Sequence, residues 1–403
     1  MSKKKYTFID LFAGCGGLSE GFYRQGFKAL AHVEIDHWAC ESLRARMKYY
    51  GYKNYNEEVI EDDITSEDII KKIDKAIKGR KVDIIIGGPP CQAYSTAGRV
   101  RAGEKMAKDP RNYLFESYVR ILEYYLPKFF VFENVTGLLS AKVANTPILP
   151  KVLRALGNKY RVITNPDILV HNTADYGVPQ LRKRVIIMGV RNDLETEVLQ
   201  LYHDVTKTHW NPETPENERQ NRSRYVNVRD AIGDLPPVEP GEDASSEGYD
   251  YPCNNGFLQR IGQKGVHPLM DHIARRHNDL DRERFQVMIH NHWSFGQLRK
   301  EMPQYEHEHA RVFDNSYVVQ WWELPSKTIL AHIHKDGFQF IHPDEAQRRT
   351  FTVREAARIQ SFPDDFEFKG SRGEKYKQIG NAVPPLFAEA LAKSIRKNLD
   401  KLS

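Results

Sequence analysis

The sequence predicts an α/β domain built on a mostly parallel sheet, together with a smaller and less regular second domain. The first half of the chain alternates short β-branched or aromatic runs with helical patterns, and this alternation stops after residue 190. Such a rhythm is typical of a parallel sheet with helices on both faces. The length of 403 residues also exceeds what one small core needs and suits two domains.

The individual elements follow from local patterns. Apolar, β-branched and aromatic runs predict strands at residues 6–11, 29–34, 82–87, 129–132 and 185–190. Helical spacing of apolar residues predicts helices at residues 18–25, 37–49, 66–78, 112–125, 352–362 and 385–399. We expect Thr65 or Ser66 to cap the third of these helices.

The late part of the chain predicts an insert in the α/β domain. Residues from about 205 to 260 are rich in Pro, Asn, Glu, Gly and Ser, and no clean periodicity follows as far as about residue 340. We therefore expect a first domain over residues 1–244, an insert over residues 245–340, and a return of the chain to the first domain over residues 341–403.

Composition excludes several classes of protein. No apolar run reaches the roughly 18 residues of a membrane helix, so we expect a cytoplasmic protein without a membrane partner. The four cysteines are widely spaced and form no CxxC pair, and the histidines of residues 290–334 match no zinc pattern, so we expect no metal. The net charge of +5 permits nucleic-acid binding but does not require it.

A glycine turn follows the first predicted strand. Gly14, Gly16 and Gly17 are spaced Gly-x-Gly-Gly, which differs from the pattern of dinucleotide binders. Glu34, near the end of the second strand, could accept hydrogen bonds from ribose hydroxyls, and Asp63 could bind an adenine amine. An adenosine ligand therefore fits this turn, and the ligand does not need to carry a phosphate group. The alternative is an ordinary strand–helix turn with a surface glutamate.

A Gly-Gly-Pro-Pro-Cys sequence follows the predicted strand at residues 82–87 and ends at Cys91. The stiff loop would hold this thiol at the carboxyl edge of the sheet. A cysteine thiol is an intrinsically strong nucleophile. Glu133 follows the apolar residues of the next strand and could face the same pocket, where a carboxylate can hold or donate a proton. The alternatives are a conformationally useful loop and a salt-bridged strand end.

These residues, taken in order, resemble the DNA cytosine-5-methyltransferases over nearly the whole chain. The resemblance includes residues 10–17, Glu34, Asp63-Ile64, Gly-Pro-Pro-Cys at residues 88–91 and Glu133-Asn134-Val135. It continues with residues 180–184, 354–363 and 380–385. It implies a Rossmann-like domain that binds S-adenosylmethionine and a target-recognition domain at residues 245–340.

The resemblance also implies a role for each matching residue. Cys91 would attack carbon 6 of cytosine, Glu133 would bind ring nitrogen 3 and the exocyclic amine, Arg184 would hold the carbonyl oxygen, and Arg182 would position the loop or a phosphate. The implied S-adenosylmethionine residues are Phe12, Gly14, Gly16, Gly17, Glu34, Ile35, Asp63, Ile64, Pro89, Leu114, Asn381 and Ala382. Ile35 departs from the family, which often has an aromatic residue there.

The implied partner is double-stranded DNA, from which the target cytosine must be flipped. The candidate DNA-binding residues are Gln92, Ser95, Arg99, Arg275, Arg276, Asn291 and His292. For Ser95 and Arg99 a solvated loop is an equal alternative. We expect a monomer that shares its target site with a cognate restriction endonuclease.

Three competing functions remain. A tRNA methyltransferase could use the same core, although the long insert favours duplex DNA. A catalytically inactive DNA-binding relative is disfavoured by intact Cys91, Glu133 and Arg184. An oxidoreductase is disfavoured because the third glycine of the dinucleotide pattern is missing and no residue suits hydride transfer.

Overall fold

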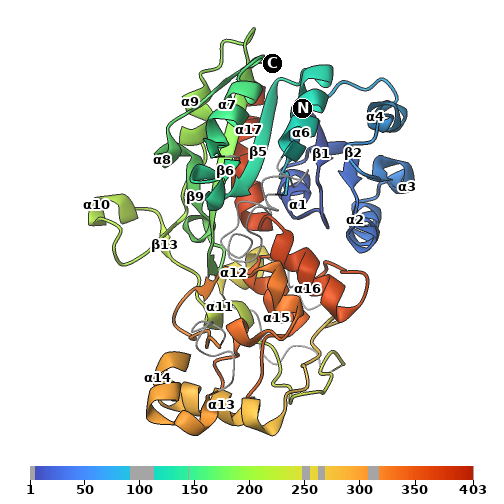
Figure 1. Ribbon diagram of the computed structural model, residues 1–403. Coiled ribbons are helices and arrows are strands. Elements are labelled where there is room, and N and C mark those ends of the chain that lie inside the picture. The colour runs from blue at the N-terminus through green and yellow to red at the C-terminus, as the bar shows by residue number, and fades with distance from the viewer. Residues whose placement is uncertain are drawn as a thin grey trace. The chain divides into compact units, whose positions relative to one another are not determined.

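The computed structural model describes residues 5–90, 113–143, 145–246, 255–261, 268–306 and 317–402. The chain forms two compact units (Figure 1). The first unit comprises Met1–Tyr176, Lys183–Lys207 and Pro385–Ser403. The second unit comprises Gly177–Arg182 and Thr208–Pro384. The predicted insert at residues 245–340 falls within the second unit, and its separate role stays a prediction.

The first unit contains a sheet whose described strands run in the order β3-β2-β1-β4-β5-β11-β8, with β9 also paired to β11. The strands are β1 (Thr7–Leu11), β2 (Lys28–Glu34), β3 (Val59–Glu61), β4 (Ile84–Gly87), β5 (Phe129–Val135), β8 (Tyr160–Val162), β9 (Val170–Asn172) and β11 (Lys183–Arg191). The first five of the strands in that order are parallel, and β11 is antiparallel to β5. The mostly parallel α/β fold is therefore confirmed.

The first unit also contains helices, most of which connect the strands of the sheet along the chain. They are α1 (Gly17–Arg24), α2 (His37–Tyr49), α3 (Tyr55–Glu58), α4 (Ile69–Ile77), α6 (Leu114–Tyr125), α7 (Leu149–Leu156), α8 (Pro166–Leu169), α9 (Val198–His203) and the C-terminal α17 (Pro385–Lys401). Short β6 (Lys142–Val143) and β7 (Thr146–Pro147) pair with each other. Helices α1 and α17 pack so closely that a Cβ on Gly21 would lie 2.3 Å from the backbone of Ala388.

The second unit is mostly short helices joined by irregular segments. Its helices are α10 (Glu216–Arg219), α11 (Val228–Ile232), α12 (Gly256–Arg260), α13 (Asp279–His290), α14 (Phe295–Glu301), α15 (Val353–Ile359) and α16 (Arg372–Asn381). Its strands are β10 (Gln180–Leu181), β12 (His209–Trp210), β13 (Ser223–Arg224) and β14 (Ser326–Lys327). An apolar cluster that includes Phe285, Met288, Phe295 and Leu298 joins α13 to α14.

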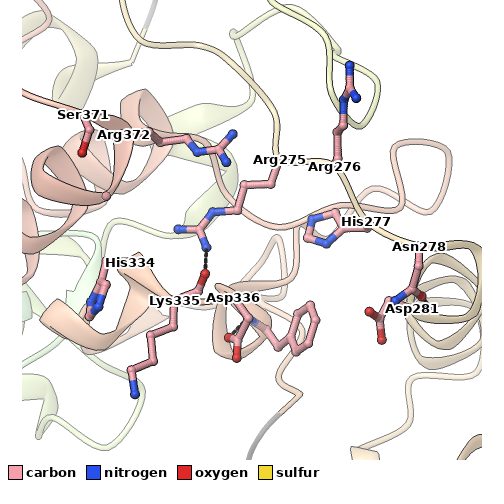
Figure 2. Close-up of a pocket in the computed structure, with 12 residues that line it drawn as sticks. Arg275, Arg276, His277, Asn278, Asp281, His334, Lys335, Asp336, Ser371 and Arg372 are labelled. Atoms are coloured by element: carbon pink, nitrogen blue, oxygen red, sulfur yellow. Dashed lines mark hydrogen bonds between the residues drawn. The ribbon is translucent and has the colours of Figure 1, made fainter.

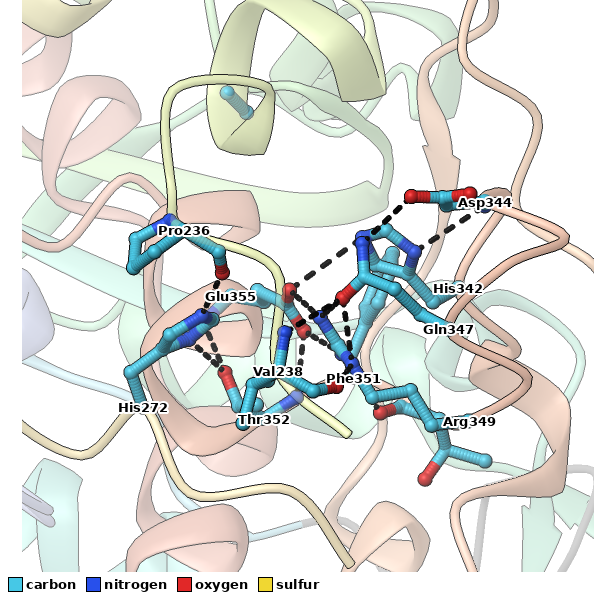
Figure 3. Close-up of polar contacts among 12 residues, drawn as sticks. Pro236, Val238, His272, His342, Asp344, Gln347, Arg349, Phe351, Thr352 and Glu355 are labelled. Atoms are coloured by element: carbon cyan, nitrogen blue, oxygen red, sulfur yellow. Dashed lines mark hydrogen bonds and ion pairs between the residues drawn. The ribbon is translucent and has the colours of Figure 1, made fainter. Parts of the chain in front are cut away.

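A buried polar network surrounds the start of α15 (Figure 3). Glu355 accepts two hydrogen bonds from Arg349, at 2.8 and 2.7 Å, and one from the backbone N–H of Thr352 at 2.7 Å. His272 contacts the Thr352 hydroxyl at 3.1 Å and the carbonyl oxygen of Pro236 at 2.8 Å. This network gives Glu355 of the matching 354–363 motif a role in packing.

Two details of the sequence prediction differ from the structure. The predicted cap of α4 is wrong: the helix begins at Ile69, and Ser66 instead donates its hydroxyl to Asp62 at 3.0 Å. Helix α13 was not predicted, because it buries the ion pair of Asp281 and Arg284 among its apolar residues and so loses a clean apolar period.

Within the residues that the structure describes, no helix is long and apolar enough to cross a membrane. The same described residues contain no group of three or more His, Cys, Asp or Glu side chains arranged to hold a metal ion.

Candidate active site

The glycine turn after β1 and the carboxylate at the end of β2 lie together. The backbone N–H of Gly14 donates to Glu34 Oε2 at 2.7 Å, and those of Ile35 and Asp36 donate to Oε1 at 2.9 Å each. Burial raises the pKa of the Glu34 carboxyl, and these N–H groups oppose the rise. A carboxylate held by fixed donors has a defined direction in which its remaining lone pairs can bind a ligand.

The turn has room for a ligand at one glycine and none at another. Gly14 has φ of 54° and a Cβ there would meet nothing within 4 Å, whereas a Cβ on Gly16 would lie 2.6 Å from Leu43. Phe12 also has a positive φ, 59°, and is half-buried beside the turn. Gly17 is the first residue of α1. The open face at Gly14 therefore lies next to the Glu34 carboxylate that its N–H binds.

Further predicted adenosine residues lie on the neighbouring segments. Ile35 exposes 65% of its surface directly after Glu34. Asp63 uses one carboxylate oxygen to accept from Thr65, at 2.8 Å from the backbone and 2.7 Å from the hydroxyl, while Ile64 is buried. These residues fit an adenosine group: an apolar platform, a carboxylate for hydroxyls and a second carboxylate at the β3 edge.

A buried acid lies beneath the glycine turn. Asp10 on β1 accepts a 2.6 Å hydrogen bond from Ser19 on α1 and is 1% exposed. Burial raises the pKa of Asp10 to about 8, although the Ser19 hydroxyl lowers it in part. Asp10 therefore joins β1 to α1 and does not face a ligand. The sequence alone did not distinguish these two roles.

The loop after β4 passes directly beside Glu133. A Cβ on Gly88 would lie 2.7 Å from Glu133 Oε2, so only a glycine leaves the carboxylate where it is. Asn134 donates from Nδ2 to the carbonyl oxygen of Pro89 at 3.2 Å and so anchors the loop to β5. Pro89 is buried, and Leu114, half-buried, begins α6. The sequence contained Asn134 in a matching motif, yet gave no sign of this anchoring contact.

Glu133 and Arg184 form an ion pair across adjacent strands. Arg184 Nε lies 2.9 Å from Glu133 Oε1, and the two side chains are 9% and 13% exposed. Burial lowers the pKa of the Arg184 guanidinium, and the Glu133 carboxylate opposes this change. The antiparallel register of β5 and β11 places Glu133 opposite Ile186 and Arg184 opposite Val135. Two predicted catalytic residues are thus in contact in the first unit.

The cysteines divide into two groups. Cys15 and Cys40 are buried, and burial raises the pKa of both thiols, which disfavours their reactive thiolate forms. Cys91, the predicted nucleophile, lies outside the described residues, as do the predicted DNA contacts Gln92, Ser95 and Arg99. The described residues that lead to Cys91 end at Pro90, immediately after Pro89, whose carbonyl oxygen Asn134 binds.

Arg182 lies in the second unit and is 1% exposed. It donates to the carbonyl oxygens of Ile329 at 2.6 Å, Gly380 at 3.1 Å and Ala382 at 3.0 Å. Ala382 is buried, and the exposed Asn381 between the two acceptors ends α16. Arg182 therefore fixes the backbone around two residues predicted to bind the cofactor, and that cofactor role stays a prediction.

The candidate recognition residues differ in exposure. Asn291 and His292 are exposed, and His292 stacks on Trp321 with ring centroids 4.7 Å apart. Arg276 is exposed, whereas Arg275 is 5% exposed and donates to the carbonyl oxygens of Lys335 and Ile333. Their DNA-binding roles stay predictions, with three of these four side chains accessible to a partner.

Comparison with known proteins gives consistent matches. The family model described as C-5 cytosine-specific DNA methylase matches residues 6–397. Type II methyltransferase M.Bpa9945I of Bacillus paralicheniformis is 34% identical, with 96% of this chain and 98% of that protein covered. Type II methyltransferase M.DdeI of Desulfomicrobium norvegicum is 35% identical, with 96% and 88% covered.

Solved structures show the same fold. A protein described as a DNA modification methyltransferase encoded within a prophage (E. coli) has a TM-score of 0.70 and 25% identity, with 98% of this chain and 100% of that chain covered. The Dnmt2 methyltransferase of S. pombe has a TM-score of 0.55 at 16% identity, with 98% and 100% covered, and so shares the fold.

Proposed function

The chain belongs to the family of C-5 cytosine-specific DNA methylases and is a DNA (cytosine-5)-methyltransferase, and from this premise we propose how its own residues perform the reaction. The target is a cytosine flipped out of duplex DNA, because a stacked base cannot be attacked from above its ring. The nucleophile is Cys91. The observation that carries the proposal is the ion pair between Glu133 and Arg184. This pair lies beside Gly88, which belongs to the segment that leads to Cys91.

The cofactor is S-adenosylmethionine, which when bound supplies an electrophilic methyl group carried on a sulfonium. Glu34 would accept hydrogen bonds from its ribose hydroxyls, and the open face of Gly14 leaves space beside that carboxylate. Ile35 would pack on the adenine, and Asp63 has a second oxygen for the adenine amine. Phe12, Pro89, Leu114, Asn381 and Ala382 complete the proposed set.

Glu133 and Arg184 would together bind the polar edge of the flipped cytosine. The Glu133 carboxyl would bind ring nitrogen 3 and the exocyclic amine, and Arg184 would donate to the carbonyl oxygen. Their ion pair fixes the acid relative to the guanidinium before substrate arrives, which lowers the cost of orienting them. A side chain longer or shorter by one methylene group, at position 133 or 184, would lose that orientation.

The Cys91 thiolate would form a bond to carbon 6 while Glu133, in its protonated form, gives its proton to ring nitrogen 3. The ring electrons then collect at carbon 5, which becomes the nucleophilic centre that the free base lacks. After carbon 5 is methylated, its proton would pass to solvent water, and the electron pair left behind would form the double bond between carbons 5 and 6. The bond between carbon 6 and sulfur would break, Cys91 would leave as a thiolate, and ring nitrogen 3 would return its proton to Glu133.

The biological role that we propose is protection of DNA in a type II restriction–modification pair, because the relatives described above carry that type II name. Residues 245–340 would read the target sequence, with Asn291 and His292 among the exposed candidates for base contacts. The protein would act as a monomer in the cytoplasm, on the site that a cognate endonuclease cuts.

The direct test is expression in a bacterial host that lacks cytosine-5 methylation, followed by bisulfite sequencing of the host DNA. We expect methylated cytosines in one sequence context, and none with Cys91→Ser or with Glu133→Gln at equal protein level. Cys40→Ser serves as the matched control, because that thiol is buried on α2 outside the proposed set of residues, and it should retain methylation. Unmethylated DNA together with methylated host tRNA would contradict the proposal.

A further inference from the structure

A cavity in the second unit is lined by an excess of cationic side chains (Figure 2). Its volume is about 390 Å³, and Arg275, Arg276, Lys335 and Arg372 contribute to its wall. These residues come from three separate stretches of the chain, so their convergence results from the fold and not from a local run of basic residues.

The cations of this cavity are not neutralised internally. Within the ranges that the structure describes, the side chains of Arg276, Lys335 and Arg372 form no ion pair and no hydrogen bond, and all three are exposed. Two carboxylates also line the wall. Asp281 already binds Arg284 at 2.9 Å and the Tyr317 hydroxyl at 2.7 Å, and Asp336 accepts from the backbone N–H of Phe338 at 3.0 Å.

Arg275 forms the most buried part of the cavity wall. Its side chain is 5% exposed, and two of its guanidinium nitrogens donate to the carbonyl oxygens of Lys335 and Ile333. Its Nε is buried and has no partner among the described residues. The guanidinium also lies over the ring of Tyr376, 4.2 Å from the centroid. Arg275 therefore fixes the backbone of Lys335 in the cavity wall, and its charge adds to that of the three exposed cations.

We propose that this cavity, defined by Arg275, Arg276, Lys335 and Arg372, binds the phosphodiester backbone of the DNA duplex. Arginine and lysine are the residues that bind phosphate oxygens, and an unpaired group of them raises the local concentration of a polyanion. The proposal rests on the function proposed above and specifies part of it: this contact holds the duplex without reading its sequence. It also assigns Arg276, a candidate for DNA binding, to phosphate and not to a base edge.

The test uses the full-length protein and two 30-base-pair duplexes of unrelated sequence, with affinity measured by fluorescence anisotropy in 50 to 200 mM KCl, a salt range suited to counting phosphate contacts. The variants are Arg276→Gln and Arg372→Gln. We expect each variant to weaken binding about tenfold on both duplexes alike, because a tenfold loss corresponds to one charge-assisted hydrogen bond. The slope of log affinity against log salt should fall in magnitude by about 0.9 for each phosphate released.

Two controls separate this contact from a general loss of charge. Arg229→Gln removes an exposed arginine of the same unit that already pairs with Glu323 at 2.9 Å, and it should leave the salt slope unchanged. Arg372→Lys keeps the charge and should keep the slope. Thermal unfolding of the glutamine variants should match the wild type, because both arginines are exposed and unpaired.

Wild-type methylation of host DNA distinguishes failure of this proposal from failure of the proposed function. If the wild type methylates and binds DNA while Arg276→Gln and Arg372→Gln leave its salt slope intact, the phosphate cavity is wrong and the function stands. A change in the methylated sequence context, or weakening on only one duplex, would assign the cavity to base readout and overturn the proposal. Weaker binding of tRNA with unchanged binding of duplex DNA would overturn it as well.

Discussion

Glu34 shows how one side chain organises the proposed cofactor site. Its two carboxylate oxygens accept three backbone N–H groups, from Gly14, Ile35 and Asp36, and thereby join the end of β2 to the turn after β1. Since those donors belong to the backbone, their positions are set by the strands and not by flexible side chains. The carboxylate is therefore oriented before any ligand arrives.

Glu34→Ala should weaken S-adenosylmethionine binding at least tenfold, because it removes charge-assisted hydrogen bonds worth about 1.5–3 kcal/mol. Affinity for duplex DNA should change little. Titration calorimetry with cofactor alone measures the effect. The control is Glu61→Ala at the end of the adjacent strand β3, whose carboxylate pairs with His37 and Arg44. An unchanged cofactor affinity would make Glu34 a purely structural residue.

The sequence placed some of these residues correctly and missed the contacts of others. Glu34 follows an apolar run, so its place at the end of a strand was predictable from the pattern. The ion pair of Glu133 with Arg184 was not, because it depends on the antiparallel register of β11. The buried donors of Arg182 could not be predicted either, since their acceptors are carbonyl groups about 150 to 200 residues away.

At the scale of elements, the β4 loop and β5 form one rigid arrangement. Gly88 allows the loop to pass the Glu133 carboxylate, and Asn134 fastens the loop through Pro89. The strands themselves were predictable because they are continuous apolar runs buried on both faces. Helices α13 and α14 were less so. Asn278 and Ser294 cap them, but α13 mixes buried charges with its apolar residues.

Gly88→Ala should lower kcat more than tenfold while KM for the cofactor changes little. The added Cβ would lie 2.7 Å from Glu133 Oε2 and must displace the carboxylate from its position beside Arg184, and small displacements of catalytic groups cost large factors in rate. Steady-state kinetics on duplex DNA measures this. Gly296→Ala is the control, because its Cβ meets only the Ser294 hydroxyl at 3.9 Å. Equal kinetics for both variants would contradict the assigned role of the loop.

At the scale of the whole molecule, both units bury titratable groups. Burial lowers the pKa of His32 and His171 to about 4 in the first unit. In the second unit, burial lowers the pKa of His277 to about 4 and of His342 to about 3. These histidines are therefore held as neutral rings in the two units.

Stability should therefore fall as pH falls from about 6.5 toward 4. In this window the unfolded histidines, with an ordinary pKa near 6.5, bind protons that the folded ones do not, so each contributes up to about 1.4 kcal/mol of lost stability per pH unit. Asp10 acts in the opposite direction, because its raised pKa of about 8 keeps a proton that the unfolded chain loses. Burial also lowers the pKa of His272 and raises that of Glu34, so urea unfolding at pH 5 and pH 6.5 measures the balance of five histidines against two acids. Equal stability at both values would contradict it.

The covalent role of Cys91 is the central claim, and a duplex with 5-fluorocytosine at the methylated position tests it most directly. Thiolate addition and methylation can proceed, but release requires loss of a proton from carbon 5, and fluorine cannot leave as a cation. The account predicts an adduct that survives denaturing electrophoresis, forms only with S-adenosylmethionine present and maps to Cys91. An adduct on Cys15, Cys40 or Cys253, or no adduct from an enzyme that methylates the unfluorinated duplex, would contradict it.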